Sequence, residues 1–230
     1  MKQEVFTSSL YVKYVIDIWY INIKNYSNES YAEDLKGLPK GMQQELQRQN
    51  SIQEKKLKLL GRLIVRFYEH EKGRDFSLKH WKLGEFGKPY VEGAAHFSIS
   101  HSGDIVAVAF ASDELGLDLE KCVSLDVQSI SNYVHPEERN YISQSEDKLT
   151  SWFYVWTRKE AFLKAIGRGL QTGTNQENCL ESPTWKGETW SIHSEVFLEE
   201  YALALCTHNK QTLVYREIDP SFVSEANSLG

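Results

Sequence analysis

Residues 116–120 read GLDLE, and residues 156–164 read WTRKEAFLK. In the shorter run leucines alternate with other residues, which predicts a β-strand. Successive side chains of a strand point to opposite faces, so Asp118 and Glu120 should share one face and the two leucines the other. The run follows an almost continuous apolar stretch, so the acids should border a buried region, where a charge is costly unless it is paired or metal-bound.

The longer run has the spacing of an α-helix. Trp156, Glu160 and Lys164 stand at i, i+4 and i+8 and therefore lie on one stripe. A solvated, salt-bridged helix face is one interpretation, because Glu160 and Lys164 have the favoured i, i+4 order. Trp156 on the same stripe argues against full exposure, since a large aromatic ring packs under cover.

Together the two runs supply three carboxylates, those of Asp118, Glu120 and Glu160. Hard cations such as Mg²⁺ take oxygen ligands and complete their shell with water and substrate phosphates. Mn²⁺ accepts the same ligands, so the choice between the two metals stays open. A strand with two acids facing a helix with an acid and a lysine suits a metal-bound phosphate. Two acids on a solvated sheet edge are the ordinary alternative.

The composition excludes several classes of protein. The 230 residues, 41% of them hydrophobic, suffice for one large domain or two small ones. A net charge of −6 argues against a nucleic-acid partner, so an anionic ligand needs a local basic cluster. Three cysteines without zinc spacing favour a reduced compartment, and we expect a cytoplasmic protein. The apolar stretch at 10–23 is too short for a bilayer span and lacks signal-peptide features, so no membrane association is expected.

The expected order of elements is strand, helices and strands, followed by strands, helices and strands. This order predicts an α+β fold of two similar α+β units, with a boundary near residues 100–104. Strands are expected at 11–20, 96–100, 105–111, 116–120, 189–197, 201–206 and 212–218, and helices from 51 onward and at 136–143 and 151–166.

The helix that follows Ser51 begins with a capping box, in which Glu54 stands three residues later. Its apolar residues then recur at helical spacing and should bury one face. We expect the opposite, basic face to be solvated, with phosphate contact by one or two of its residues as the alternative. This face contains Lys55, Lys56, Lys58, Arg62 and Arg66.

A turn is expected at residues 102–104, and residues 100–103, which read SHSG, are expected to lie in this tight turn between strands. One histidine and two hydroxyls beside a glycine could bind a phosphate. A structural histidine in a hairpin turn is the alternative. A serine–histidine nucleophile pair is disfavoured, because adjacent residues of a strand end seldom face each other and no GxSxG elbow is present.

Four motifs occur in a fixed order, and together they closely resemble the 4′-phosphopantetheinyl transferase superfamily, of the larger surfactin-synthetase-activating type. The resemblance extends over about residues 40–169. It implies a fold of two similar α+β halves, residues 1–102 and 103–230, with the active site at their interface. The motifs are GKP at 87–89, FSISHS at 97–102, GLDLE at 116–120 and WTRKEAFLK at 156–164.

The resemblance implies an enzyme that transfers 4′-phosphopantetheine from coenzyme A to a serine of an apo acyl or peptidyl carrier protein. Mg²⁺ would be the cofactor and 3′,5′-ADP the leaving group. Both halves lie in one chain, so a monomer would suffice. Fatty-acid, polyketide and nonribosomal-peptide carriers all remain open.

The same resemblance implies roles for individual residues. The metal ligands would be Asp118, Glu120 and Glu160, with Glu160 also the general base and Lys164 the catalytic contact to the pyrophosphate. The residues that would bind coenzyme A are Lys40, Gly87, Lys88, Pro89, Ser100, His101 and Lys164, with His101 at the 3′-phosphate and residues 87–89 at the adenine.

Two positions depart from the family. Leu57 stands where many members have an arginine, and Lys55, Lys56 or Lys58 would have to replace it at the 3′-phosphate. Ser98 stands where asparagine is frequent, and we expect it to point away from the ligand.

The resemblance also suggests a docking region for the carrier. Residues 135–138 match a family pattern near which carriers dock. Apolar residues between Val127 and Ile142, with Lys121 and Arg139 as a basic rim, are therefore candidate contacts.

Two other functions remain as alternatives. One is a non-catalytic module of the same fold that binds coenzyme A or a carrier protein. A non-catalytic module would not need all three acids and Lys164, and their presence disfavours this alternative. The other is a metal-dependent phosphodiester hydrolase, a class that commonly needs denser histidine and aspartate clusters than this chain offers.

Overall fold

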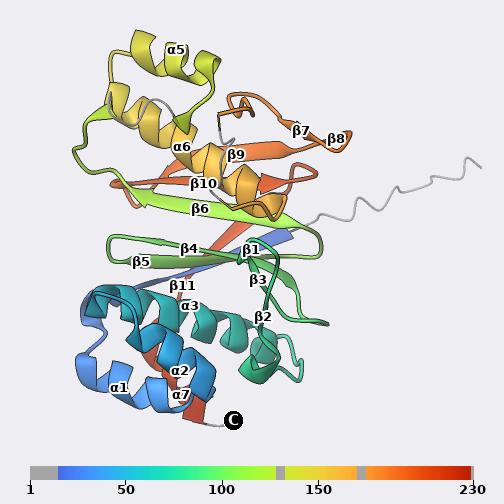
Figure 1. Cartoon of the computed structure of the whole chain (residues 1–230). Helices are drawn as coiled ribbons and strands as arrows, with labels where there is room; N and C mark the ends of the chain where they lie inside the picture. Colours follow the sequence, from blue (N-terminus) through green and yellow to red (C-terminus); the bar gives the residue numbers. More distant parts are fainter. Residues whose placement is uncertain (1–14, 128–132, 170–174, 229–230) are drawn as a thin grey trace, which may run out of the picture.

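The computed structural model describes residues 15–127, 133–169 and 175–228. Figure 1 shows four layers, in which two packed sheets separate two groups of helices. The lower group contains α1 (Asn28–Lys36), α2 (Lys40–Gln47), α3 (Ile52–Glu71) and α7 (Pro220–Ser228). The upper group contains α5 (Pro136–Gln144) and α6 (Lys148–Ala165).

The four-stranded sheet has the order β11-β1-β5-β4. β1 pairs in parallel with β11 and antiparallel with β5, which pairs antiparallel with β4. The strands are β1 (Val15–Asn22), β4 (His96–Ser102), β5 (Ile105–Ala111) and β11 (Thr212–Glu217). The strand expected at 11–20 therefore begins at Val15 in the described part of the chain, and residues 11–14 lie outside it.

The three-stranded sheet is antiparallel and has the order β6-β10-β9. Its strands are β6 (Leu115–Lys121), β9 (Ser191–Phe197) and β10 (Tyr201–Thr207). Shorter elements join the layers: η1 (Ile23–Asn25), η2 (Leu78–His80), β2 (Lys82–Leu83), β3 (Pro89–Tyr90), β7 (Thr184–Trp185) and β8 (Glu188–Thr189).

An apolar core fills the space between the two sheets. Leu117 and Leu119 are fully buried in it, together with Ile105 and Leu203. The alternation expected for residues 116–120 is therefore correct, since burying the leucines directs the acids of β6 toward the helix on the other face.

Helix α6 packs directly against β6 because Gly116 of the strand has no side chain to keep the two backbones apart. A Cβ atom at Gly116 would overlap the carbonyl oxygen of Ala161 and the amide nitrogen of Ala165. The helix ends at Ala165, and Gly167 follows with a φ of +68°, a left-handed conformation that favours glycine after a helix. The close approach brings Glu160 of the helix next to the acidic face of the strand.

Helix α3 begins as expected, with the Ser51 hydroxyl accepting the N–H of Glu54 at 3.1 Å. Its basic face, however, is not simply solvated, and that prediction is wrong for two residues. Arg62 and Arg66 are only 7% and 6% exposed. The Arg62 guanidinium donates to Glu45 Oε1 at 2.6 Å, because α2 packs beside this face and supplies a carboxylate.

The turn between β4 and β5 consists of Gly103 and Asp104, within the turn predicted at residues 102–104. Strand β4 extends to Ser102, so the expectation that residues 100–102 also belong to the turn is wrong. Gly103 has a φ of +55°, which a side chain would disfavour. Ser100 and His101 consequently belong to a strand, and their side chains point to opposite faces of it.

The mixed helices and sheets confirm the expected α+β class. The expected boundary between residues 102 and 103 falls at the turn between β4 and β5, two strands of one sheet. That sheet also includes β11, which returns from the end of the chain. The similarity of two halves, and their division at this position, stay predictions.

Candidate active site

Three carboxylates meet between β6 and α6. Asp118 and Glu120 project from the strand and Glu160 from the helix, and one ligand atom of each lies within 4.8 Å of the others. Asp118 is 1% exposed, and the other two are half-buried. The structure thus brings together the residues that the sequence proposed as metal ligands.

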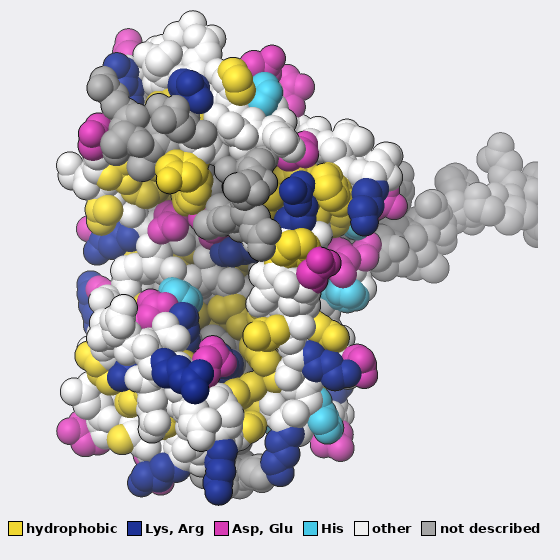
Figure 2. All heavy atoms as spheres, viewed as in Figure 1, with side chains coloured by type: hydrophobic (Ala, Val, Ile, Leu, Met, Phe, Trp, Pro, Cys, Tyr) yellow, Lys and Arg dark blue, Asp and Glu magenta, His cyan; other side chains and the backbone are white. Residues whose placement is uncertain are grey.

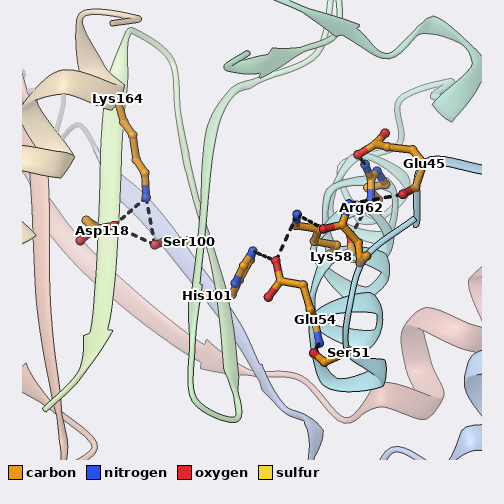
Figure 3. A network of polar contacts seen from close by, with 10 residues as sticks. Glu45, Ser51, Glu54, Lys58, Arg62, Ser100, His101, Asp118 and Lys164 are labelled. Carbon is orange, nitrogen blue, oxygen red and sulfur yellow. Dashed lines mark hydrogen bonds and ion pairs between the residues drawn. The ribbon is translucent and has the colours of Figure 1, made fainter. Parts of the chain in front are cut away.

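Lys164 lies one helical turn beyond Glu160. Its Nζ donates to Asp118 Oδ1 at 2.6 Å and to Ser100 Oγ at 3.0 Å (Figure 3). The lysine is therefore bound across to β6 and β4, so its main partner is not a neighbour on its own helix. The interpretation of this stripe as a solvated helix face is wrong.

The electrostatics of the cluster are unfavourable for three charged acids. Burial, with repulsion from Asp118 and Glu120, raises the pKa of Glu160 to about 8, although Lys164 and a hydrogen bond from Trp156 work against this. Burial and Asp118 also raise the pKa of Glu120. Burial disfavours a charged Lys164, but attraction by Asp118 and Glu160 outweighs this and raises its pKa. An added positive charge would stabilise all three carboxylates.

The residues fit a hard divalent cation. All donors are carboxylate oxygens, which Mg²⁺ and Mn²⁺ prefer. Asp118 Oδ2 is buried, and no described residue donates a hydrogen bond to it. Such an orphaned buried anionic oxygen is costly unless a cation or water meets it. The unpaired Asp118 oxygen and the three carboxylate donors therefore indicate the same position for a cation.

Strand β4 separates this acidic cluster from a second polar group. Ser100 faces Asp118, whereas His101 faces α3, where its Nε2 lies 3.8 Å from Glu54 Oε1 (Figure 3). Glu54 also pairs with Lys58 Nζ at 3.1 Å. Burial lowers the pKa of His101, with Lys164 and Lys58 adding to the effect of burial and Glu54 opposing it.

Two cavities flank the carboxylates. The first, of about 310 Å³, contains Glu160 and Lys164 in its wall, together with residues 86–89, which include the GKP motif. Gly87 has a φ of +85° in the turn between β2 and β3. Lys88 Nζ, in contrast, donates to Glu114 and to the carbonyl of Leu115, both at 3.0 Å. The lysine of the motif is thus bound to the protein itself.

The second cavity is apolar and opens on the Glu120 side. It measures about 550 Å³. Its lining consists of Ser102, Gly103, Glu120, Lys121, Val123, Leu125, Tyr133, Trp152, Phe153 and Trp156. Part of the predicted carrier-docking region, residues 128–132, lies outside the described residues.

The remaining predicted positions lie away from the carboxylates. Lys40 is exposed at the first residue of α2. Leu57 is 3% exposed and belongs to the core beneath α3, so this position contributes no polar group. Of its proposed replacements, Lys58 is linked to His101 through Glu54, whereas the ammonium of Lys56 donates to the carbonyl of Tyr26.

Two features near the site were not predicted from the sequence. Lys159 is fully buried, and its Nζ lies 3.0 Å from Glu138 Oε2, so it belongs to the packing of α5 against α6. Ser98 does not simply point away from the site: its hydroxyl accepts the N–H of Leu117 at 2.9 Å. The sequence does indicate that Ser98 faces the same way as Ser100, because serines alternate at 98, 100 and 102 with the period of a strand face.

Basic and acidic side chains of the described residues are interspersed over the face of the molecule in Figure 2. An anionic ligand would therefore depend on local cations such as Lys164 and Lys58. No helix among the described residues has both the length and the apolar character that a membrane crossing requires.

Known proteins resemble the chain over much of its length. Residues 114–206, which contain β6, α5 and α6, match the sequence model of the 4′-phosphopantetheinyl transferase superfamily. A 4′-phosphopantetheinyl transferase of Bacillus subtilis is 36% identical over 162 residues, 64% of this chain and 72% of the relative. The chain therefore belongs to the 4′-phosphopantetheinyl transferase superfamily.

Two further relatives agree with this assignment. The 4′-phosphopantetheinyl transferase gsp of Aneurinibacillus migulanus is 26% identical over 181 residues, 73% of this chain and 75% of the relative. The 4′-phosphopantetheinyl transferase Sfp of Bacillus subtilis (strain 168) is 34% identical over 117 residues, 49% of this chain and 52% of the relative.

Proposed function

We propose that the protein transfers the 4′-phosphopantetheine group of coenzyme A to a serine of an apo acyl or peptidyl carrier protein, in a reaction that requires Mg²⁺. One observation carries the proposal in a chain of this superfamily: three carboxylates within 4.8 Å of one another, next to a lysine, with an orphaned Asp118 oxygen among them.

Coenzyme A would occupy the cavity beside residues 86–89, where Lys164 meets its pyrophosphate. Asp118, Glu120 and Glu160 would hold the metal ion. When bound, a divalent cation supplies positive charge to the non-bridging phosphate oxygens in phosphoryl transfer. Lys164 contributes to the same neutralisation, and its bonds to Asp118 and Ser100 hold its ammonium in place.

The covalent step exchanges a phosphoanhydride bond of coenzyme A for a phosphate ester bond to the carrier serine. The carrier serine oxygen forms a bond to the β-phosphorus of coenzyme A, and the bond from this phosphorus to the bridging oxygen breaks. The electron pair leaves with 3′,5′-ADP, and the serine proton passes to Glu160, directly or through water. Without a metal, burial and the neighbouring acids raise the pKa of Glu160 to about 8, so the charge of a bound cation would be needed to keep this carboxylate ionised and able to accept the proton.

His101 and Lys58 would recognise the 3′-phosphate on the other side of β4. Their shared contact with Glu54 supports this assignment, because a phosphate could take the carboxylate's place between the Lys58 ammonium and the His101 imidazole, which can donate a hydrogen bond to it. Lys58 would then take the role of the arginine that many family members have at the position of Leu57. Lys40, Lys88 and the backbone of Gly87 and Pro89 remain proposed contacts to the nucleotide.

The carrier would dock at the apolar cavity on the Glu120 side. Val123 and Tyr133 are exposed there, and Lys121 lies at the rim. An apolar centre with a basic rim suits an acidic helical partner. This side leads directly to the carboxylates, which supports it as the approach for the carrier serine. A single chain would suffice for the site.

The proposal is tested by Asp118→Asn and Glu160→Gln in a transfer assay with Mg²⁺ and an apo carrier. Both variants should lose at least about 100-fold in kcat/KM, because a transition-state charge contact is removed. Glu146→Gln is the control. It changes an exposed acid that does not belong to the carboxylate cluster, so this variant should retain activity. Full activity in either site variant would contradict the proposal.

A further inference from the structure

Strand β6 forms one end of the three-stranded sheet, so one edge of its backbone lacks a neighbouring strand. That edge faces β4 of the other sheet. Three alternate N–H groups of β6 donate to three serine hydroxyls of β4: Leu117 to Ser98 at 2.9 Å, Leu119 to Ser100 at 3.2 Å and Lys121 to Ser102 at 3.0 Å. We call Ser98, Ser100 and Ser102 the serine seam.

The serine seam solves a problem of hydrogen bonding. Buried N–H groups at a sheet edge must find acceptors, and a backbone ladder is not formed between β4 and β6. Serines at every second position of β4 face the edge, and each meets the residue 19 positions later in the chain. The two sheets are thus held in a fixed register by side chains.

Two members of the serine seam also contact the acids. The Ser100 hydroxyl donates to Asp118 Oδ1 at 2.9 Å, and the Ser102 hydroxyl donates to Glu120 Oε2 at 2.7 Å. In each case the oxygen accepts a backbone N–H, which fixes the direction in which its own proton points. Ser98 has only the backbone contact among its described interactions.

We propose that Ser100 and Ser102 are positioning residues that orient the carboxylates of Asp118 and Glu120, whereas Ser98 only joins the strands. The four-stranded sheet would thereby set the geometry of acids that belong to the other sheet. This inference rests on the proposed function only where it concerns metal binding. Ser102 is the better test position, because Ser100 also contacts Lys164.

The first test needs neither metal nor substrate. Amide hydrogen exchange in the metal-free protein should show faster exchange at Leu117 in Ser98→Ala and at Lys121 in Ser102→Ala, by about tenfold or more. The carboxylate carbon resonance of Glu120 should move in Ser102→Ala and stay unchanged in Ser98→Ala. Unchanged exchange at both amides, or a Glu120 shift that is equal in both variants, would overturn the proposal.

The second test measures Mn²⁺ binding by electron paramagnetic resonance. Ser102→Ala should weaken binding by about tenfold, while Ser98→Ala should stay within about twofold of the unmodified protein. Ser102→Thr keeps the hydroxyl and should restore the affinity, which separates loss of the contact from failure to fold. Equal weakening in both alanine variants would mean a purely structural seam and would overturn the positioning role.

The two tests separate the inference from the proposed function. If the unmodified protein bound neither Mn²⁺ nor Mg²⁺, with or without coenzyme A, the proposed function would fail. The amide exchange and the Glu120 resonance would still support or overturn the serine seam.

Discussion

Glu160 experiences the strongest electrostatic conflict among the site residues. It is half-buried beside Asp118 and Glu120, and Lys164 relieves only part of their repulsion. A strand period of two and a helix period near 3.6 predicted which of these four side chains share a face, and the resemblance to the family assigned them to the site. The sequence could not indicate which carboxylate holds a proton, since that depends on burial in three dimensions.

A stability measurement tests this state of Glu160. Its pKa rises from the ordinary 4.5 to about 8, so between these values the folded state holds a proton that the unfolded state has lost. The unfolding free energy of the metal-free protein should therefore fall as pH rises through this window. Glu160→Gln should weaken that fall and be about 1–3 kcal/mol more stable at pH 8. Urea unfolding with a chelator at pH 5 and pH 8 measures it, and an unchanged slope would contradict the assignment.

Lys58 is the proposed contact to the 3′-phosphate of coenzyme A, and its removal tests that contact. Lys58→Ala should raise KM for coenzyme A about tenfold, the effect of losing one charge-assisted hydrogen bond. It should change KM for 3′-dephospho-coenzyme A little, because that substrate lacks the phosphate. Lys56→Ala is the matched control, since its ammonium binds the carbonyl of Tyr26. Equal effects on both substrates would remove Lys58 from the 3′-phosphate site.

Among the elements, β6 and α6 determine the site through their close contact at Gly116. The sequence predicted both elements and the end of the helix. It did not predict that Lys159 and Glu138 form a buried ion pair, or that Arg62 and Arg66 are buried on α3. A charged residue in a helix pattern reads as exposed unless a partner from another element is known, and such partners are far apart in sequence.

Gly116→Ala tests the contact between strand and helix. The added methyl group would overlap the backbone of Ala161 and Ala165, which cannot yield like a flexible side chain. The variant should lose about 1–3 kcal/mol of unfolding free energy and also lose activity, because Glu160 moves with the helix. Gly41→Ala, at a position with open space around it, is the control and should keep its stability. A fully stable and active Gly116→Ala would contradict the packing described.

For the whole molecule, the sequence predicted an α+β class and most strands, but not their arrangement. β11 returns to pair in parallel with β1, and α7 (Pro220–Ser228) then packs against α3. These are long-range pairings without a local signal. The serine seam is of the same kind: the alternating serines are visible in the sequence, but their partners on β6 are not.

The arrangement leaves the carboxylates between two cavities, one lined by residues 86–89 and one by apolar side chains near Glu120. A donor on one side and a protein acceptor on the other would meet at these acids.

The most direct test is intact-protein mass spectrometry of an apo carrier protein incubated with this protein and coenzyme A, with and without Mg²⁺. We expect the carrier to gain one phosphopantetheine group, and this gain should depend on the metal. No gain on acyl, polyketide or peptidyl carriers, despite measured binding of coenzyme A, would contradict it and would instead indicate a non-catalytic binding module.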